Sequence, residues 1–257
     1  MRRTKPDSLE AQQRLVAILL NDKRGDAAIA IAKDVQRQRK DSSIGYILEA
    51  ESLLSIGKRP EAVKVYEEAY RREKSAASIL RLHNAHLAAN QPQEAAKLAA
   101  DWIKANPKDL TVRTYLAERS LAEQKYDQAV NQYRQMQEIA PKNPMVLNNL
   151  AWALGKLNDK SAVQIAQEAV ALAPNSPVVL DTLGMLQFEN GEKAKGLENL
   201  RKAVSLGPKL PQLRLSLAKA LAANGDKDGA RKELEEALKN APEKAPIRKE
   251  IDKFRAT

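Results

Sequence analysis

Apolar residues recur along this chain every three or four positions, which is the period of an α-helix. Leu180, Leu183 and Leu186 form one apolar stripe, and Leu200 and Val204 belong to a second stripe after a short polar turn. Residues three or four apart share one face of a helix. This segment therefore predicts two amphipathic helices joined by a turn, with the apolar stripes facing each other.

The same segment recurs along the chain at a fixed spacing. Its clearest copies open at Pro144, Pro177 and Pro211, which are 33 and 34 residues apart. Self-similarity at this period indicates a stacked repeat architecture, in which each unit contacts mainly its neighbours. Four earlier copies complete the set. We expect a leader over residues 1–8, a C-terminal helix over 245–257, and seven repeats between them, near 9–42, 43–75, 76–109, 110–143, 144–176, 177–210 and 211–244.

Prolines and glycines support these boundaries. All 12 prolines fall at expected helix ends or first turns, where a missing N–H costs little. Gly57, Gly191 and Gly225 occupy matching places in the turns between paired helices. Small residues recur where two helices of a pair should cross, such as Gly184 and Gly196, with alanine at most of the equivalent positions. The sequence thus predicts closely packed helix pairs and no sheet.

The last segment has the pattern of a capping helix. Ile247, Ile251 and Phe254 are spaced i, i+4, i+7 and form one apolar stripe on an otherwise charged segment. A terminal repeat exposes an apolar face that a following repeat would cover. We expect this helix to cover that face.

These repeats resemble the tetratricopeptide repeat (TPR) family. Leu183-Gly184, Leu200, Ala203 and Pro208 stand at the motif positions of repeat six. The first three repeats depart from the motif at its proline and small-residue positions. The resemblance implies an all-α, right-handed superhelical solenoid of about seven repeats plus the capping helix. It also implies a non-enzymatic scaffold that binds a protein or peptide segment along its concave surface.

In the TPR family the concave surface is lined by first-helix residues about one turn apart. The Lys/Asn carboxylate clamp of chaperone-binding TPR proteins is absent from these positions. One of these positions is Trp152, which we interpret as a groove residue that contacts a peptide. The alternative is that Trp152 is a core residue packed between neighbouring first helices. Carrying the lining positions over gives Ile47, Glu51, Leu80, Asn84, Thr114 and Glu118, followed by the six main candidates for peptide binding, Asn148, Trp152, Asp181, Met185, Leu215 and Lys219.

A narrower resemblance rests on "NNLAW" at 148–152 and "VLDTLG" at 179–184. This pair is similar to the C-terminal repeats of the TPR lipoprotein of the bacterial exosortase/PEP-CTERM sorting system. The resemblance implies a role in envelope export or sorting. Such a lipoprotein needs a signal peptide and an anchoring cysteine, and the sequence contains neither. On this interpretation we expect a fragment of a larger protein of the periplasm or envelope, and otherwise a cytoplasmic protein.

The net charge of +10 raises an alternative function, a basic helical-repeat protein that binds RNA. The basic residues, however, alternate with acidic ones, as in "RKELEEALK" at 231–239. Such mixing is typical of a solvated helix surface rather than a phosphate track. Among the six main candidates only Lys219 is basic. The charge pattern therefore favours a protein partner over nucleic acid, and it leaves the oligomeric state open. No run of residues is apolar enough for a transmembrane segment.

Little in the sequence indicates catalysis or metal binding. His83 and His86 share a helix face at i, i+3 spacing, which could hold a metal, but both stand at packing positions and no cysteine or suitably spaced carboxylate accompanies them. We therefore interpret them as packing residues. A phosphate loop and a nucleophile elbow are both missing. The sequence predicts a protein without enzymatic activity or cofactor.

Overall fold

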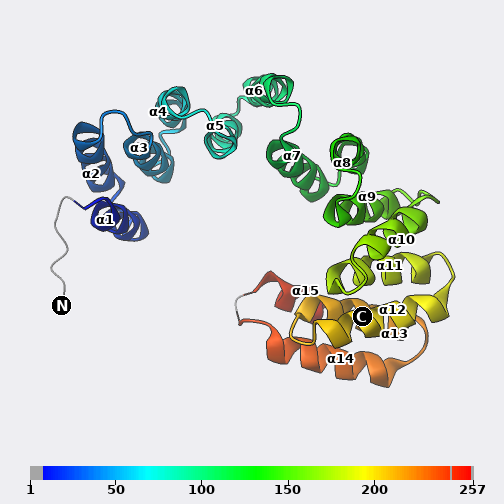
Figure 1. The fold of residues 1–257 in the computed structure, drawn as a ribbon. Coiled ribbons are helices and arrows are strands. Elements are labelled where there is room, and N and C mark those ends of the chain that lie inside the picture. Colours follow the sequence, from blue (N-terminus) through cyan, green and yellow to red (C-terminus); the bar gives the residue numbers. More distant parts are fainter. Residues whose placement is uncertain (1–7, 244, 256–257) are drawn as a thin grey trace. The chain divides into compact units, whose positions relative to one another are not determined.

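The computed structural model describes residues 8–243 and 245–255, and all regular structure in them is helical (Figure 1). These residues form fifteen α-helices and no strand. The predicted all-α solenoid of helix–turn–helix repeats with a final short helix is confirmed. The expected leader lies outside the described residues except for Ser8. The Oγ of Ser8 accepts a hydrogen bond from the backbone N–H of Ala11 (3.1 Å) and caps the first helix. Pro6, one of the 12 prolines expected at helix boundaries, also lies outside the described residues.

The chain divides into two compact units, residues 1–115 and 116–257, and the division falls inside α7. None of the described helices is long and apolar enough to span a lipid bilayer. The helices are α1 Leu9–Asn21, α2 Gly25–Gln38, α3 Ile44–Ser55, α4 Arg59–Arg72, α5 Ala76–Ala88, α6 Pro92–Ala105, α7 Leu110–Ala122, α8 Tyr126–Ile139, α9 Pro144–Lys156, α10 Ala162–Leu172, α11 Pro177–Glu189, α12 Lys193–Leu206, α13 Pro211–Ala223, α14 Lys227–Asn240 and α15 Pro246–Arg255.

Helix starts follow the prolines and the caps. Pro144, Pro177 and Pro211 are the first residues of α9, α11 and α13, where the proline ring fits the helical φ and no N–H is lost from the ladder. Asn143 precedes α9, and its side-chain oxygen accepts hydrogen bonds from the N–H groups of Met145 (3.0 Å) and Val146 (3.3 Å). These contacts satisfy donors that the first helical turn would leave open.

The turn inside each helix pair contains one residue in the left-handed region. Glycine adopts this conformation at no steric cost, whereas other residues lose about 1–2 kcal/mol. The tight helix–helix connection therefore imposes the same backbone even where the sequence offers no glycine. The seven positions are Lys23, Gly57, Asn90, Gln124, Asn158, Gly191 and Gly225, with φ of 58°, 78°, 60°, 57°, 55°, 92° and 91°.

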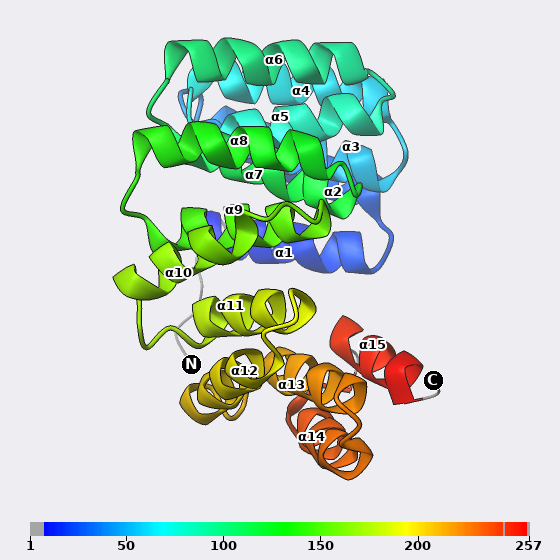
Figure 2. The same cartoon turned by 90° about the vertical axis from the view of Figure 1, so that its right-hand side faces the viewer.

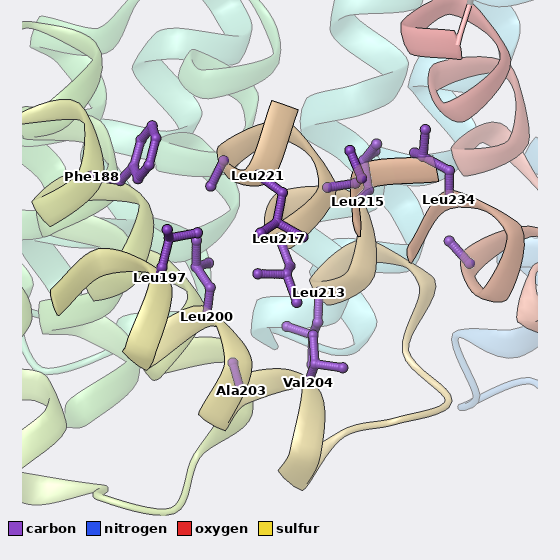
Figure 3. Close-up of a cluster of buried hydrophobic side chains, with 14 of the residues drawn as sticks. Phe188, Leu197, Leu200, Ala203, Val204, Leu213, Leu215, Leu217, Leu221 and Leu234 are labelled. Atoms are coloured by element: carbon purple, nitrogen blue, oxygen red, sulfur yellow. The ribbon is translucent and has the colours of Figure 1, made fainter. Parts of the chain in front are cut away.

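The largest hydrophobic cluster lies in the second unit (Figure 3). It joins buried side chains of α11, α12, α13 and α14, among them Leu200 and Leu215, both of which are fully buried. Smaller clusters hold the first unit together, one between α1, α2 and α3 and another between α3, α4 and α5. Each unit thus has local cores between neighbouring helices, as expected for a repeat architecture.

Helices α11 and α12 approach each other through two glycines. A Cβ built on Gly184 would lie 2.9 Å from the carbonyl oxygen of Gly196 and 3.0 Å from the backbone nitrogen of Leu200. A Cβ on Gly196 would lie 2.7 Å from the carbonyl oxygen of Gly184. These are backbone atoms in packed helices, so the neighbours cannot simply rotate away.

We expect Gly184→Ala to lower the free energy of unfolding by about 1–3 kcal/mol, because the added methyl must separate two helix backbones. Gly155→Ala is the matched control. A Cβ on Gly155 meets only the side chain of Leu186, which can adjust. Urea denaturation followed by circular dichroism measures both variants, and equal midpoints for the two would contradict the close-approach argument.

The final helix covers the end of the stack. Helix α15 contacts both α13 and α14, and Figure 2 shows it beside α13. Ile251 is fully buried, and Ile247 and Phe254 are partly buried against the cluster of the second unit. The predicted apolar stripe therefore faces the preceding repeat.

Candidate binding groove

The second unit has a groove of about 520 Å³ on the side formed by the first helices of its repeats. Helix α11 lies between α9 and α13 and contacts both. The side chains that line the groove include Glu118 of α7, Tyr133 of α8, Asn148, Asn149, Trp152 and Lys156 of α9, Asp181, Met185 and Glu189 of α11, Ser216 and Lys219 of α13, and Glu250 of α15.

Five of the six main candidates from the sequence line this one groove: Asn148, Trp152, Asp181, Met185 and Lys219. The expectation for Leu215 is wrong, because its side chain is fully buried in the hydrophobic cluster and cannot contact a peptide. The next residue, Ser216, lines the groove in its place.

Trp152 lies at the surface of the groove, with 38% of the residue exposed. The alternative interpretation as a core residue does not fit this exposure. Its ring meets the ring of Tyr126 edge-on at a centroid distance of 6.2 Å, and the Lys156 ammonium lies 5.0 Å from its centroid. These contacts orient the indole while leaving part of it open to a ligand.

Asn148 and Asp181 each bring a buried polar atom to the groove. Asn148 is only 4% exposed, and its Nδ2 donates a hydrogen bond to Oδ1 of Asn149 (3.1 Å). The Oγ of Ser216 donates a hydrogen bond to Oδ2 of Asp181 (3.1 Å). The Oδ1 atoms of Asn148 and Asp181 are both buried and accept no hydrogen bond from any described protein group. The groove therefore contains at least two acceptors that the fold itself does not satisfy, and the hydroxyl of Tyr133 is a further buried polar atom in its lining.

Burial raises the pKa of the Asp181 carboxyl to about 7. The hydrogen bond from Ser216 and the positive charge of Lys219 act in the opposite direction but are the smaller effects. The Lys219 ammonium is held by Glu250, with Nζ 2.7 Å from Oε1. Because this cation is already paired, it compensates Asp181 only in part.

Sequence reasoning missed Ser216, which lies on a helix with predicted candidates, and Glu250, which lies on another element. Ser216 stands one turn before Lys219 on α13, a spacing that could have marked it. Glu250 is contributed by the capping helix, and only the packing of α15 on α13 brings it to the groove. No sequence spacing predicts that contact.

The candidate positions of the first unit have a different character. Ile47 is buried in a local cluster, and Asn84 accepts a hydrogen bond from the hydroxyl of Tyr115 (2.7 Å). Burial raises the pKa of Glu51, opposed by the charge of Arg81. Leu80 is half-buried, and Thr114 is the remaining candidate of this unit. Ile47 is thus closed to a ligand, whereas Asn84 and Glu51 have partners within the unit and remain partly open to solvent.

The two histidines are both buried in the first unit. Nδ1 of His83 lies 2.9 Å from the hydroxyl of Tyr115, and Nδ1 of His86 lies 2.9 Å from Oε1 of Gln91. The rings of His83 and Tyr115 also meet edge-on at a centroid distance of 5.2 Å. Each histidine thus has neighbours suited to a packing residue. Within residues 8–243 and 245–255, no group of three or more acidic, histidine or cysteine side chains could hold a metal ion.

Comparison with family models identifies the repeats. The family model described as Tetratricopeptide repeat matches residues 47–109, 80–144 and 182–245, which together cover more than half of the chain. No curated protein matches the sequence. The match is to the repeat as such, and the narrower resemblance to the exosortase-system lipoprotein stays a prediction.

Solved structures show the same fold at low sequence identity. TTC0263, a thermophilic TPR protein of Thermus thermophilus, is 21% identical, with a TM-score of 0.58 over 71% of this chain and 100% of that one. The C-terminal part of a TPR repeat-containing protein from Cytophaga hutchinsonii is 15% identical, with a TM-score of 0.58 over 91% and 97%. MamA (residue 41 to the end) from Desulfovibrio magneticus RS-1 is 20% identical, with a TM-score of 0.52 over 64% and 94%.

Proposed function

Because the chain belongs to the tetratricopeptide repeat family, whose members serve as protein-interaction scaffolds, we propose that it binds a peptide segment of a partner protein in the groove of its second unit. The scaffold acts without chemistry of its own. Its first helices supply a rigid surface, and the partner supplies the segment that lies along it.

One observation supports this proposal above the others: the partly exposed indole of Trp152 stands among buried polar groups. Aromatic and methionine side chains next to hydrogen-bonding groups are typical of peptide-recognition surfaces. Met185 lies on the adjacent first helix and lines the same groove. The groove therefore offers apolar contact and hydrogen bonding within one site.

The charges of the groove favour a peptide over RNA. Carboxylates of Glu118, Asp181, Glu189 and Glu250 line it, and Lys219 is held by one of them. Binding to phosphates draws on several unpaired basic side chains along one track. A groove rich in carboxylates repels a nucleic-acid backbone.

The wider assembly is a second part of the proposal. The phrases at 148–152 and 179–184, which resemble repeats of the exosortase-system lipoprotein, fall on α9 and α11, and both helices contribute to the groove. We propose a bacterial envelope sorting or export assembly as the first place to look for the partner. Affinity purification with the wild-type protein and with Trp152→Ala tests this proposal. Partners that both proteins retain equally would exclude the groove as the binding site.

Trp152→Ala is expected to weaken peptide binding by about 30-fold or more, the loss typical of truncating a hot-spot aromatic. Ligands are selected from an acetylated hexapeptide library displayed on beads, and their affinities are measured by isothermal titration calorimetry. Because Trp152 is 38% exposed, its loss should cost less stability than the ~3–5 kcal/mol of a core tryptophan.

Leu206→Ala is the matched control, since Leu206 is 43% exposed on α12 and does not line the groove. It should leave affinity unchanged. If selected peptides bind Trp152→Ala as tightly as wild-type protein, the groove is not the binding site.

A further inference from the structure

Two buried hydrogen-bond acceptors in one groove indicate which hydrogen-bond donors a ligand must supply. Oδ1 of Asn148 and Oδ1 of Asp181 accept no hydrogen bond from described protein groups, and both residues line the groove from adjacent first helices. A buried acceptor without a partner is unfavourable, because it has given up its hydrogen bonds to water and gained none in return. A ligand that donates to both atoms recovers this loss, so the complementary group is rich in N–H donors.

The charge of the groove points to a cationic donor. The carboxylates of Glu118, Glu189 and Glu250 line it, and the carboxyl of Asp181 adds a fourth negative charge above about pH 7, against two ammonium groups. Both ammonium groups are engaged, Lys219 with Glu250 at 2.7 Å and Lys156 over the indole of Trp152 at 5.0 Å. The groove is thus locally acidic in a chain whose net charge is +10.

The indole of Trp152 suits the same kind of group. A tryptophan face attracts cations, and the Lys156 ammonium already lies over this ring. Guanidinium is planar, stacks on aromatic rings and presents five donors in a fixed fork, whereas an ammonium is a compact, strongly hydrated point charge. The combination of a flat aromatic surface with two separate acceptors therefore matches arginine better than lysine.

We propose that the groove selects a peptide segment carrying an arginine, whose guanidinium donates to Asp181 and Asn148 while its methylene stem lies against Trp152 and Met185. This inference rests on the proposed peptide-binding function and adds the identity of the recognised side chain. It assigns Asp181 as the specificity-determining residue of the groove.

The test uses the full chain and an acetylated, amidated hexapeptide library in which one position is fixed and the others are mixed. Libraries fixed as arginine should be retained above those fixed as lysine, glutamine or glutamate. The tightest arginine peptide is then resynthesised with citrulline, which keeps the shape but removes the charge. We expect citrulline to weaken binding by about tenfold or more, as for loss of a hydrogen-bonded charge pair.

At pH 8, where Asp181 of the wild-type protein is ionised, Asp181→Asn should bind the arginine and citrulline peptides nearly equally, because the variant keeps the shape of the side chain and lacks its charge. Glu198→Gln on α12 is the matched control, since Glu198 is exposed, does not line the groove and carries the same charge. It should keep the full preference for arginine. Melting curves by circular dichroism verify that both variants are folded.

The outcomes separate the two proposals. Peptides that bind through Trp152 but tolerate citrulline overturn the arginine inference and leave the peptide-binding function standing. The arginine inference is also overturned if Glu198→Gln weakens the preference for arginine over citrulline as much as Asp181→Asn does. The preference would then come from the overall charge of the protein and not from Asp181. A library from which wild-type protein retains no peptide overturns both.

Discussion

Ile251→Ala is expected to lower the free energy of unfolding by about 2–5 kcal/mol, the range for truncating a fully buried aliphatic side chain. Ile251 is the one residue of α15 whose side chain is completely covered, and it joins the cluster formed by α11 to α14. Lys253→Ala, an exposed change on the same helix, should have little effect. Urea denaturation followed by circular dichroism measures both variants.

Removal of residues 245–257 should have a larger effect of the same kind. It uncovers the apolar face around Leu234 that α15 now covers, so we expect a lower melting temperature and self-association. Sedimentation velocity measures the association. An unchanged melting curve with an unchanged monomer, or equal effects of Ile251→Ala and Lys253→Ala, would show that α15 contributes nothing to the stack.

Asp181→Asn is expected to stabilise the protein above neutral pH by up to about 4 kcal/mol, from three pKa units at 1.36 kcal/mol each. Burial raises the pKa of Asp181 from 3.8 to about 7 in the folded protein, while the unfolded chain keeps the ordinary value. Between about pH 4 and 7 the folded state therefore holds a proton that the unfolded state has released. Stability contributed by this group falls as pH rises through that window, and the loss is complete above it.

Urea denaturation at pH 5, 6, 7 and 8 measures this effect. The gap in stability between the wild-type protein and Asp181→Asn should have about a third of its full size at pH 5, because the unfolded chain is already ionised there, and should reach its full size by pH 8. Glu198→Gln serves again as control and should follow the wild-type curve. A difference between Asp181→Asn and wild type that stays constant from pH 5 to 8 would contradict the raised pKa.

Much of the fold could be predicted from the pattern of apolar residues and prolines. The repeat spacing, the helix starts at Pro144 and Pro177 and the apolar stripe of α15 are local properties, and the structure contains all of them. The turns were predicted only where glycine marks them. Lys23 and Gln124 adopt the same left-handed conformation because two packed helices fix the connection between them, a tertiary effect that residue type does not reveal.

The groove was predicted less completely, and Leu215 shows why. It occupies the same place in its repeat as Asn148 and Asp181, at the border between the groove face and the core face of the first helix. An amide or carboxyl at that border keeps its polar atoms toward the groove, whereas a leucine turns into the apolar cluster. Equivalent positions of different repeats therefore have the same place on the first helix, but the residue type decides whether the side chain faces the groove or the core.

The contact between Lys219 and Glu250 constrains how an array of this kind can grow by duplication of a repeat. A repeat gained between α14 and α15 would carry Glu250 away from α13 and leave the Lys219 ammonium without this partner. That ammonium would then act on Asp181 with its full charge. Adding a repeat at this end of the array would thus change the charge of an existing groove. The number of repeats and the ligand preference of the groove are therefore coupled.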